Sequence, residues 1–169
     1  LTEVLNAVPV HKGDCFFIPS GTLHAIGKGI VVAEVQQNSN VTYRVYDYGR
    51  VGADGKPRAL HVEKALEVMD YHRYELPQFQ DETVVKDTYT CRILSRCKYF
   101  ECASYQIHGT AELPAYSDSF SSLVCVKGSG TLYKQDEKMQ FSVGDSFFVP
   151  CSGEKIRAEG DCELILTHI

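Results

Sequence analysis

Short runs of hydrophobic residues, each ended by a turn-forming residue, make up most of this chain. The runs are rich in β-branched and aromatic side chains and stop at Gly, Pro, Asn or Ser, which is the pattern of β-strands. Strands of this length, separated by turns, predict an all-β fold built as an antiparallel sandwich or barrel. The predicted strands are 15–18, 30–36, 42–48, 91–94, 99–107, 122–126, 131–133, 138–141, 146–149 and 163–167.

Between residues 60 and 69 the pattern is that of a helix. Apolar residues fall at Val62, Ala65, Leu66 and Met69, which places them on one face of an α-helix. We therefore predict a short amphipathic helix that connects two β units. The predicted division of the chain is a first barrel unit at 1–57, a helical connector at 58–80 and a second barrel at 81–169.

An internal repeat relates the two predicted β units. Residues 13–19 and 144–150 both read Gly-Asp-x-Phe-Phe-(Ile/Val)-Pro. The shared motif predicts a tight turn at Gly-Asp, then a buried strand, then a proline that ends the ladder because it has no N–H to donate. A separate turn signal at 128–130, Gly-Ser-Gly, predicts a hairpin between two strands of the second barrel.

Charge and cysteine content narrow the function classes. The chain has 17 Lys and Arg against 22 Asp and Glu, a formal net charge of −5, which argues against a nucleic-acid-binding surface. No apolar run approaches the roughly 20 residues needed to cross a bilayer, and no secretory signal is visible. The seven cysteines include no Cys-x-x-Cys pair. We therefore expect reduced thiols and a cytoplasmic location rather than a disulfide framework or a metal knuckle.

A histidine follows the first copy of the repeat at a spacing that suggests a metal ligand. Gly13, Pro19, Gly21 and His24 have the spacing of the second cupin signature, so this segment resembles the cupin barrels. A neutral imidazole is the commonest side-chain ligand of divalent metals. The alternative is a histidine packed in the core. In the second copy Ile156 stands where His24 stands in the first, so we expect the second barrel to be metal-free.

Longer blocks carry a more specific resemblance. Residues 19–29 (Pro-Ser-Gly-Thr-Leu-His-Ala-Ile-Gly-Lys-Gly), 34–37 (Glu-Val-Gln-Gln) and 42–48 (Thr-Tyr-Arg-Val-Tyr-Asp-Tyr) resemble type I mannose-6-phosphate isomerases in their compact bacterial form, with weaker support from 60–66. The resemblance implies a cupin, or jelly-roll, fold. It would consist of a partial first barrel, the short helical connector, and a complete but degenerate second cupin barrel.

The resemblance implies a zinc-dependent interconversion of mannose 6-phosphate and fructose 6-phosphate through a cis-enediol. His24 matches the family's last zinc-ligating histidine, Arg44 its substrate-facing arginine and Glu34 an inward carboxylate. Arg44 and Glu34 are therefore the predicted catalytic and substrate-binding residues. The guanidinium of Arg44 would stabilise the enediolate or grip the phosphate. Lys28, between two glycines, either contacts the phosphate or decorates a turn.

Each of these residues also has a structural interpretation. Glu34 interrupts an apolar run, so it lies either on the wall of a polar pocket or on an exposed sheet edge. Arg44 is alternatively a surface cation on an alternating strand. The remaining histidines lack the framed spacing and are expected at the surface or in packing contacts: His11, His61, His72, His108 and His168.

The resemblance further implies that most of the zinc ligands lie outside the chain. Three of the family's four ligands, a Gln-x-His pair and a Glu, have no match before His24, and the chain begins at Leu1 in mid-strand. One imidazole cannot hold zinc tetrahedrally. We therefore expect a fragment that is inactive alone. It would associate with the missing N-terminal half, or with itself through open sheet edges.

The expected partner is a small-molecule sugar phosphate, with no nucleic-acid or membrane partner. Three alternatives stay open at the level of sequence. They are a non-catalytic sugar-phosphate-binding cupin, a purely structural cupin module, and a different metal cupin such as a dioxygenase.

Overall fold

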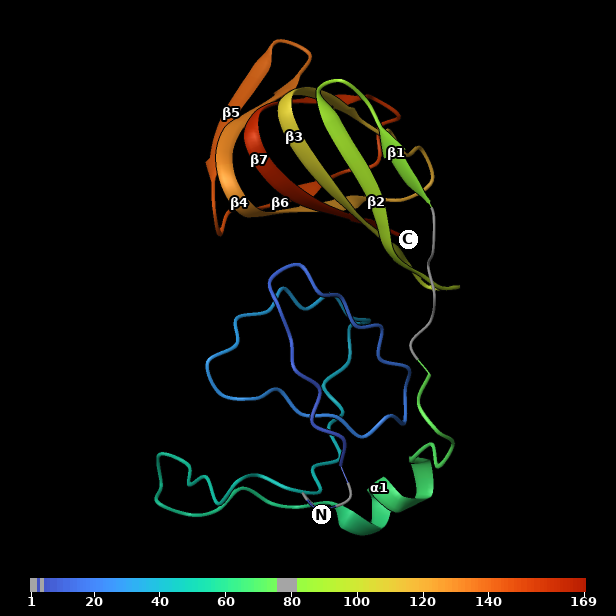
Figure 1. Ribbon diagram of the computed structural model, residues 1–169, viewed down its shortest axis with the longest axis vertical. Coiled ribbons are helices and arrows are strands. Elements are labelled where there is room, and N and C mark those ends of the chain that lie inside the picture. Colours follow the sequence, from blue (N-terminus) through green and yellow to red (C-terminus); the bar gives the residue numbers. More distant parts are fainter. Residues whose placement is uncertain (1–2, 4, 76–81) are drawn as a thin grey trace. The chain divides into compact units, whose positions relative to one another are not determined.

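The computed structural model describes residues 3, 5–75 and 82–169, and the chain divides into two units (Figure 1). The first unit comprises Leu1–Val31 and Asn38–Pro77, and the second comprises Val32–Gln37 and Gln78–Ile169. Every strand that the structure describes lies in the second unit. Within these described residues, no helix has both the length and the apolar character that a membrane crossing requires.

Antiparallel strands form the strongly curved sheet of the second unit (Figure 1). The sheet order is β1-β2-β3-β7-β4-β5, and β6 pairs with β4 outside this path. No pairing joins the end strands β1 and β5 in the described part of the chain, so the sheet stays open. The strands are β1 (Thr83–Val85), β2 (Tyr89–Arg96), β3 (Glu101–Leu113), β4 (Ser121–Lys134), β5 (Glu137–Ser142), β6 (Ser146–Val149) and β7 (Ile156–His168).

The core of the second unit is built from alternate residues of the three long strands β3, β4 and β7. This period of two is expected when one face of a strand is buried, and it confirms the all-β antiparallel prediction. Burial of each large aliphatic side chain contributes roughly 1.5–3 kcal/mol. Ile156, at the position equivalent to His24, is one of the core residues. The largest fully buried side chains are Ile107, Leu113, Leu123, Leu164 and Cys125.

The hairpin predicted at 128–130 is wrong, because β4 runs through this segment as one strand. The glycines instead permit a close approach of the paired strands β4 and β7. A Cβ at Gly128 would lie 1.9 Å from the carbonyl oxygen of Asp161, and a Cβ at Gly160 would lie 2.4 Å from that of Ser129. Glycine is required there for backbone approach rather than for a reversal of the chain.

The strands predicted at 15–18, 30–36 and 42–48 are not formed. In the described residues before 82, the pairing found is an isolated antiparallel bridge between Val51 and Pro57. β-Branched and aromatic residues favour an extended backbone, but a strand also needs a neighbour that exchanges hydrogen bonds with it. These three segments lack such a ladder in the structure, so they do not form strands.

The predicted helix is confirmed as α1 (Val62–Val68). Its apolar stripe is nevertheless largely uncovered. Ala65 is buried, whereas Leu66 is 51% exposed. α1 therefore contributes through its ends, described below, more than through burial of its apolar face.

The two copies of the internal repeat share the geometry of their Gly-Asp turn, although only the second copy continues into a strand, β6. In the first copy, Oδ2 of Asp14 accepts a hydrogen bond from the His11 N–H at 2.7 Å. In the second copy, Oδ2 of Asp145 accepts one from the Ser142 N–H at the same distance of 2.7 Å. The glycine before each aspartate has a φ of 94° or 95°. The tight turns predicted at both Gly-Asp pairs are therefore confirmed.

Candidate functional site

Arg44 is held by protein oxygens at two of its three guanidinium nitrogens. Nη1 donates to the carbonyl of Ala59 at 3.2 Å, and Nε lies 3.8 Å from Oδ1 of Asp47. Within the described residues, no hydrogen bond or ion pair engages the third nitrogen, Nη2. The side chain is 22% exposed. Nε and Nη1 thus each face a protein oxygen, which leaves Nη2 for a ligand.

Asp47 is shared between two arginines. Arg58 forms a forked pair with it: Nε donates to Oδ2 at 2.7 Å and Nη2 donates to Oδ1. These hydrogen bonds lower the pKa of Asp47 and raise the pKa of Arg58. Arg44 and Arg58 together carry two positive charges against one carboxylate. The net positive charge suits an anionic ligand such as a phosphate.

His61 fixes the backbone of Arg44 at two points. Its N–H donates to the carbonyl of Arg44 at 2.7 Å, and its Nδ1 accepts the N–H of Arg44 at 3.3 Å. Because Nδ1 accepts, the neutral ring carries its proton on Nε2. His61 is also the residue that precedes α1, and its ring meets Tyr43 edge-to-face at 6.4 Å between centroids. The sequence predicted His61 at the surface or in a packing contact. The structure adds its hydrogen bonds with the backbone of Arg44.

His24 has a defined orientation although it is exposed. Its Nδ1 lies 2.9 Å from the carbonyl oxygen of Thr22. A carbonyl can only accept, so in the neutral ring Nδ1 carries the proton and Nε2 presents its lone pair. A histidine that binds a metal through one nitrogen commonly donates the other N–H to a backbone carbonyl in this way. The local geometry of His24 therefore fits a ligand role.

The loop that carries His24 is tied to the end of α1. Thr22 closes a turn with Pro19, and the carbonyl of Gly21 accepts the N–H of Asp70 at 2.9 Å. A Cβ at Gly21 would lie 2.8 Å from the carbonyl oxygen of Val68, so the chain needs a glycine here. α1 thus holds the Arg44 segment at its start and the His24 loop at its end. A seven-residue helix separates these two attachments by about 10 Å.

The other two predicted site residues are placed differently. Lys28 is exposed in a turn that includes Gly29, whose φ is 80°. Glu34 is also exposed, and it belongs to the segment Val32–Gln37, which groups with the second unit. The structure therefore assigns His24, Lys28 and Arg44 to the first unit and Glu34 to the second.

The zinc implied by the resemblance needs several ligands together. In the part of the chain that the structure describes, no three His, Cys, Asp or Glu side chains lie close enough to hold a metal ion. His24 fits as a single ligand, but the described residues do not form a complete site. No disulfide joins the seven cysteines, all of which lie in the described residues, and three of them are buried: Cys102, Cys125 and Cys162.

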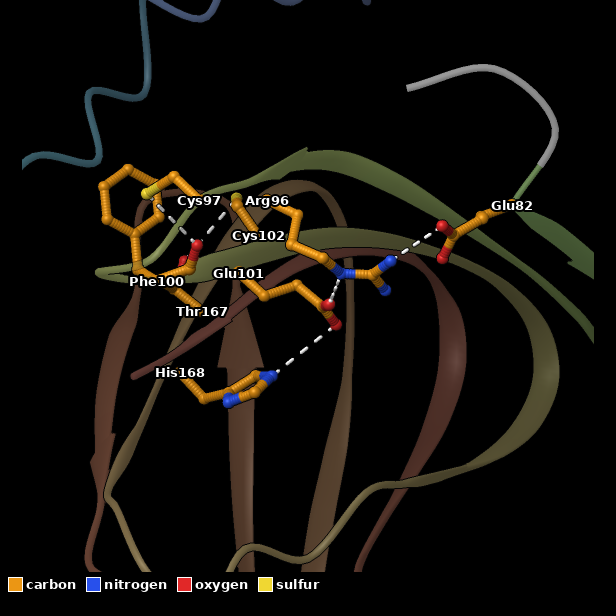
Figure 2. Close-up of polar contacts among 8 residues, drawn as sticks. All are labelled: Glu82, Arg96, Cys97, Phe100, Glu101, Cys102, Thr167 and His168. Atoms are coloured by element: carbon orange, nitrogen blue, oxygen red, sulfur yellow. Dashed lines mark hydrogen bonds and ion pairs between the residues drawn. The ribbon is translucent and has the colours of Figure 1, made fainter. Parts of the chain in front are cut away.

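A second polar cluster lies in the second unit at the ends of β2, β3 and β7 (Figure 2). Arg96 donates to Glu101, and to Oε1 of Glu82 at 2.7 Å. The other oxygen of Glu101 lies 3.5 Å from Nε2 of His168, and the His168 ring stacks on Tyr116 at 3.8 Å. These contacts join the segment before β1 to three strands. Their role is structural.

Sequence reasoning missed the partners of Arg44. Asp47 lies in the quoted block 42–48 but received no role, and Arg58 lies eleven residues further along the chain. A signal was present: Asp54-Gly55 is a turn pair, and the bridge between Val51 and Pro57 brings Arg58 back toward Asp47. Hairpin turns between two charged residues of opposite sign are the pattern to look for.

Comparison with known proteins defines the class. Residues 90–169 match the family model described as the cupin domain of mannose-6-phosphate isomerase, so the curved sheet of the second unit is a cupin domain. ManA, a mannose-6-phosphate isomerase of Bacillus subtilis, is 35% identical over 167 residues, which are 99% of this chain. A mannose-6-phosphate isomerase of Streptococcus mutans is 32% identical over 168 residues, 98% of this chain. The chain is thus similar to mannose-6-phosphate isomerases along nearly its whole length, and residues 90–169 match their cupin domain.

A solved structure gives the same result. The crystal structure of the mannose 6-phosphate isomerase from Bacillus subtilis superposes with a TM-score of 0.70 at 33% identity. The superposition covers 79% of this chain and 42% of that chain. ManA and the Streptococcus mutans enzyme are each covered to 52%. The chain therefore spans about half the length of the curated relatives it matches.

Proposed function

We propose that the protein carrying this chain interconverts mannose 6-phosphate and fructose 6-phosphate, an intramolecular aldose–ketose isomerisation. The observation that carries the proposal is the 35% identity to Bacillus subtilis ManA across 99% of the chain. The reaction moves a proton between C1 and C2 through a cis-enediol. Negative charge develops on the enediolate oxygens, and the substrate already carries a phosphate.

Arg44 is the residue that this chemistry uses most directly. Its guanidinium either stabilises the enediolate or grips the phosphate, because both are oxyanions that a fixed cation binds well. The contacts of Nη1 and Nε with Ala59 and Asp47 support a preset orientation. Glu34 is proposed as a second catalytic and substrate-binding residue. Lys28 is proposed as a minor phosphate contact from its turn.

His24 is proposed as one ligand of a zinc ion. The hydrogen bond of Nδ1 with Thr22 supports this role, because it leaves Nε2 as the nitrogen with a lone pair. The other ligands are proposed to come from protein sequence that this chain does not contain, in keeping with its coverage of 52% of ManA. We also propose that the 169-residue chain has little or no isomerase activity by itself.

A coupled assay that follows fructose 6-phosphate formation from mannose 6-phosphate tests the proposal. The natural full-length protein that carries this sequence, supplied with zinc, is expected to turn over the substrate. The 169-residue chain alone is expected to be at least about 1,000-fold slower, because one histidine cannot hold the metal. Calorimetric binding of mannose 6-phosphate without turnover by the full-length protein would favour a non-catalytic cupin instead. Ordinary isomerase rates from the 169-residue chain would refute the proposed dependence on further sequence.

A further inference from the structure

The contacts around Arg44 form one assembly with a clear division of labour. Arg58 occupies both oxygens of Asp47 through a forked pair, while Arg44 approaches Oδ1 only through Nε at 3.8 Å. Arg58 therefore takes the stronger share of the carboxylate. Asp47 is held in place by Arg58, and it then acts as a fixed stop for one edge of the Arg44 guanidinium.

The backbone beneath Arg44 is fixed independently. His61 pairs with both the N–H and the C=O of Arg44, at 3.3 Å and 2.7 Å. The carbonyl of Ala59 accepts from Nη1 at 3.2 Å. The groups that restrain Arg44 thus all come from the stretch that follows the turn at Asp54-Gly55, together with Asp47. A long, flexible side chain is restrained at both its base and its tip.

We infer that Asp47, Arg58 and His61 are positioning residues that set the orientation in which Arg44 meets an oxyanion of the substrate. The inference rests on the proposed function, since Arg44 is the substrate-facing residue of that proposal. None of the three is proposed to touch the substrate. A preset guanidinium loses less side-chain entropy on binding and is aimed before the charge develops.

The charge balance fits this arrangement. Removal of the Asp47 carboxylate would leave two adjacent guanidinium groups to repel each other, and the Nε contact of Arg44 would be lost. Removal of the Arg58 fork would leave Asp47 without its anchor, so the Nε contact of Arg44 would no longer be fixed. Both changes misplace Arg44, although neither removes it. Misplacement of a reacting group by about 1 Å can cost on the order of 100-fold in rate.

The first test measures the orientation of Arg44 directly, without activity. The Nε–Hε signal of Arg44 in the 169-residue chain is assigned by comparison with the Arg44→Lys variant, and its hydrogen exchange is measured by NMR. We expect exchange to speed up at least tenfold in Asp47→Asn and in Arg58→Gln. The matched control for Arg58→Gln is Lys56→Gln, which also removes one positive charge from this loop. It is expected to change the exchange rate less than twofold. Equal exchange in all four proteins would overturn the inference.

The second test is a double-mutant cycle on the natural full-length protein. Asp47→Asn is expected to lower kcat/KM for mannose 6-phosphate about 10- to 100-fold. In the Arg44→Lys background the same change is expected to cost less than twofold, because a positioning residue acts only through the side chain it orients. Additive effects, or a normal kcat/KM for Asp47→Asn, would overturn the inference.

The two tests also separate the inference from the proposed function. Turnover that is lost in Arg44→Lys but untouched in Asp47→Asn would leave the function standing and refute the positioning role. Absence of turnover in the full-length protein would refute the function, and the exchange measurement would still decide whether Asp47 and Arg58 orient Arg44.

Discussion

At the scale of the residue, His24 and Arg44 are each oriented by a backbone carbonyl. Nδ1 of His24 faces the carbonyl of Thr22, and Nη1 of Arg44 donates to that of Ala59. The direction of both side chains thus depends on the conformation of loops rather than on the alternation of a strand. A substitution that alters the conformation of those loops is therefore expected to reorient His24 or Arg44, even where it replaces neither residue.

Replacement of His168 by Phe is expected to stabilise the second unit. Within the described residues, Nδ1 of His168 is buried without a hydrogen-bond partner, and an unsatisfied buried polar atom carries a desolvation cost. Phe keeps the ring that stacks on Tyr116, and Glu101 keeps its pair with Arg96. We expect His168→Phe to raise the free energy of unfolding by about 1 kcal/mol, measured by urea denaturation.

The control is His108→Phe. His108 is exposed and faces the exposed Asp161, so its replacement is expected to bring no gain in stability. A loss of more than about 1 kcal/mol in His168→Phe would contradict this expectation, because it would mean that the Nε2 contact with Glu101 stabilises the fold by more than the buried Nδ1 costs.

The buried thiol of Cys162 predicts a loss of stability at alkaline pH. Burial raises the pKa of Cys162 from 9.0 to about 11, so the thiol stays protonated longer in the folded protein than in the unfolded one. The contribution is fully present below pH 9 and is lost as the pH rises through 11. The melting temperature is expected to fall across this window and to fall less steeply in Cys162→Ala. Parallel pH profiles for the two proteins would count against this explanation.

At the scale of the element, most strands after residue 82 were predicted, β1 was missed, and the three strands predicted before residue 82 are not formed. β5 and β6 were predicted to within one residue, since their partners lie in the same chain. The segments 15–18 and 42–48 have equal β-propensity but no ladder among the described residues. Propensity describes what a segment favours, whereas a strand also requires a neighbour.

The glycines of β4 mark the other limit of sequence reading. Gly-Ser-Gly is a common turn signal, yet here it permits the close approach of the paired strands β4 and β7. A single sequence does not distinguish a glycine that reverses the chain from one that admits a second backbone. The distinction needs the strand pairing, which places Gly160 of β7 opposite Gly130 of β4.

Gly128→Ala and Gly144→Ala form a matched pair that tests the close backbone approach of β4 and β7. Both glycines have positive φ, but a Cβ at Gly128 meets a carbonyl oxygen at 1.9 Å, whereas a Cβ at Gly144 meets nothing within 4 Å. Gly144→Ala is expected to cost only the backbone strain, about 1–2 kcal/mol. Gly128→Ala is expected to cost more than about 3 kcal/mol or to prevent folding. Similar losses of unfolding free energy in the two variants, measured by thermal or urea unfolding, would contradict the close approach at Gly128.

At the scale of the whole molecule, the hydrophobic core is confined to the second unit. Every residue of the core cluster, with those packed against it, lies between Tyr89 and Leu166. The exposed large apolar side chains are more numerous in the first 75 residues. His24 and Arg44 therefore lie in the unit without this core, whereas Glu34 groups with the unit that contains it.

This separation predicts that residues 82–169 fold without the rest. The peptide 82–169 is expected to unfold cooperatively, with a melting temperature within about 5 °C of that of the 169-residue chain, since it contains the complete core. Thermal unfolding followed by circular dichroism checks this. A peptide that melts without a cooperative transition would show that the first 81 residues supply contacts the core needs.

The candidate site could be predicted only in part. His24 was found from the spacing of Gly13, Pro19 and Gly21, and Arg44 from the block around it. The shared carboxylate of Asp47 and the backbone contacts of His61 depend on how the loop 48–57 closes, and that closure follows from turn geometry rather than from periodicity. Tertiary hydrogen bonds of this kind leave little trace in a single sequence.

Arg44 is proposed to be the oxyanion-binding arginine of a sugar-phosphate isomerase. NMR of ¹³C-labelled mannose 6-phosphate, incubated with zinc and the natural full-length protein, tests it directly by following the carbon signals of both sugars. The account predicts conversion to fructose 6-phosphate by the unaltered protein and a loss of at least about 100-fold in rate for Arg44→Lys, which keeps the charge but not the fork. No conversion, or a normal rate in Arg44→Lys, would contradict it.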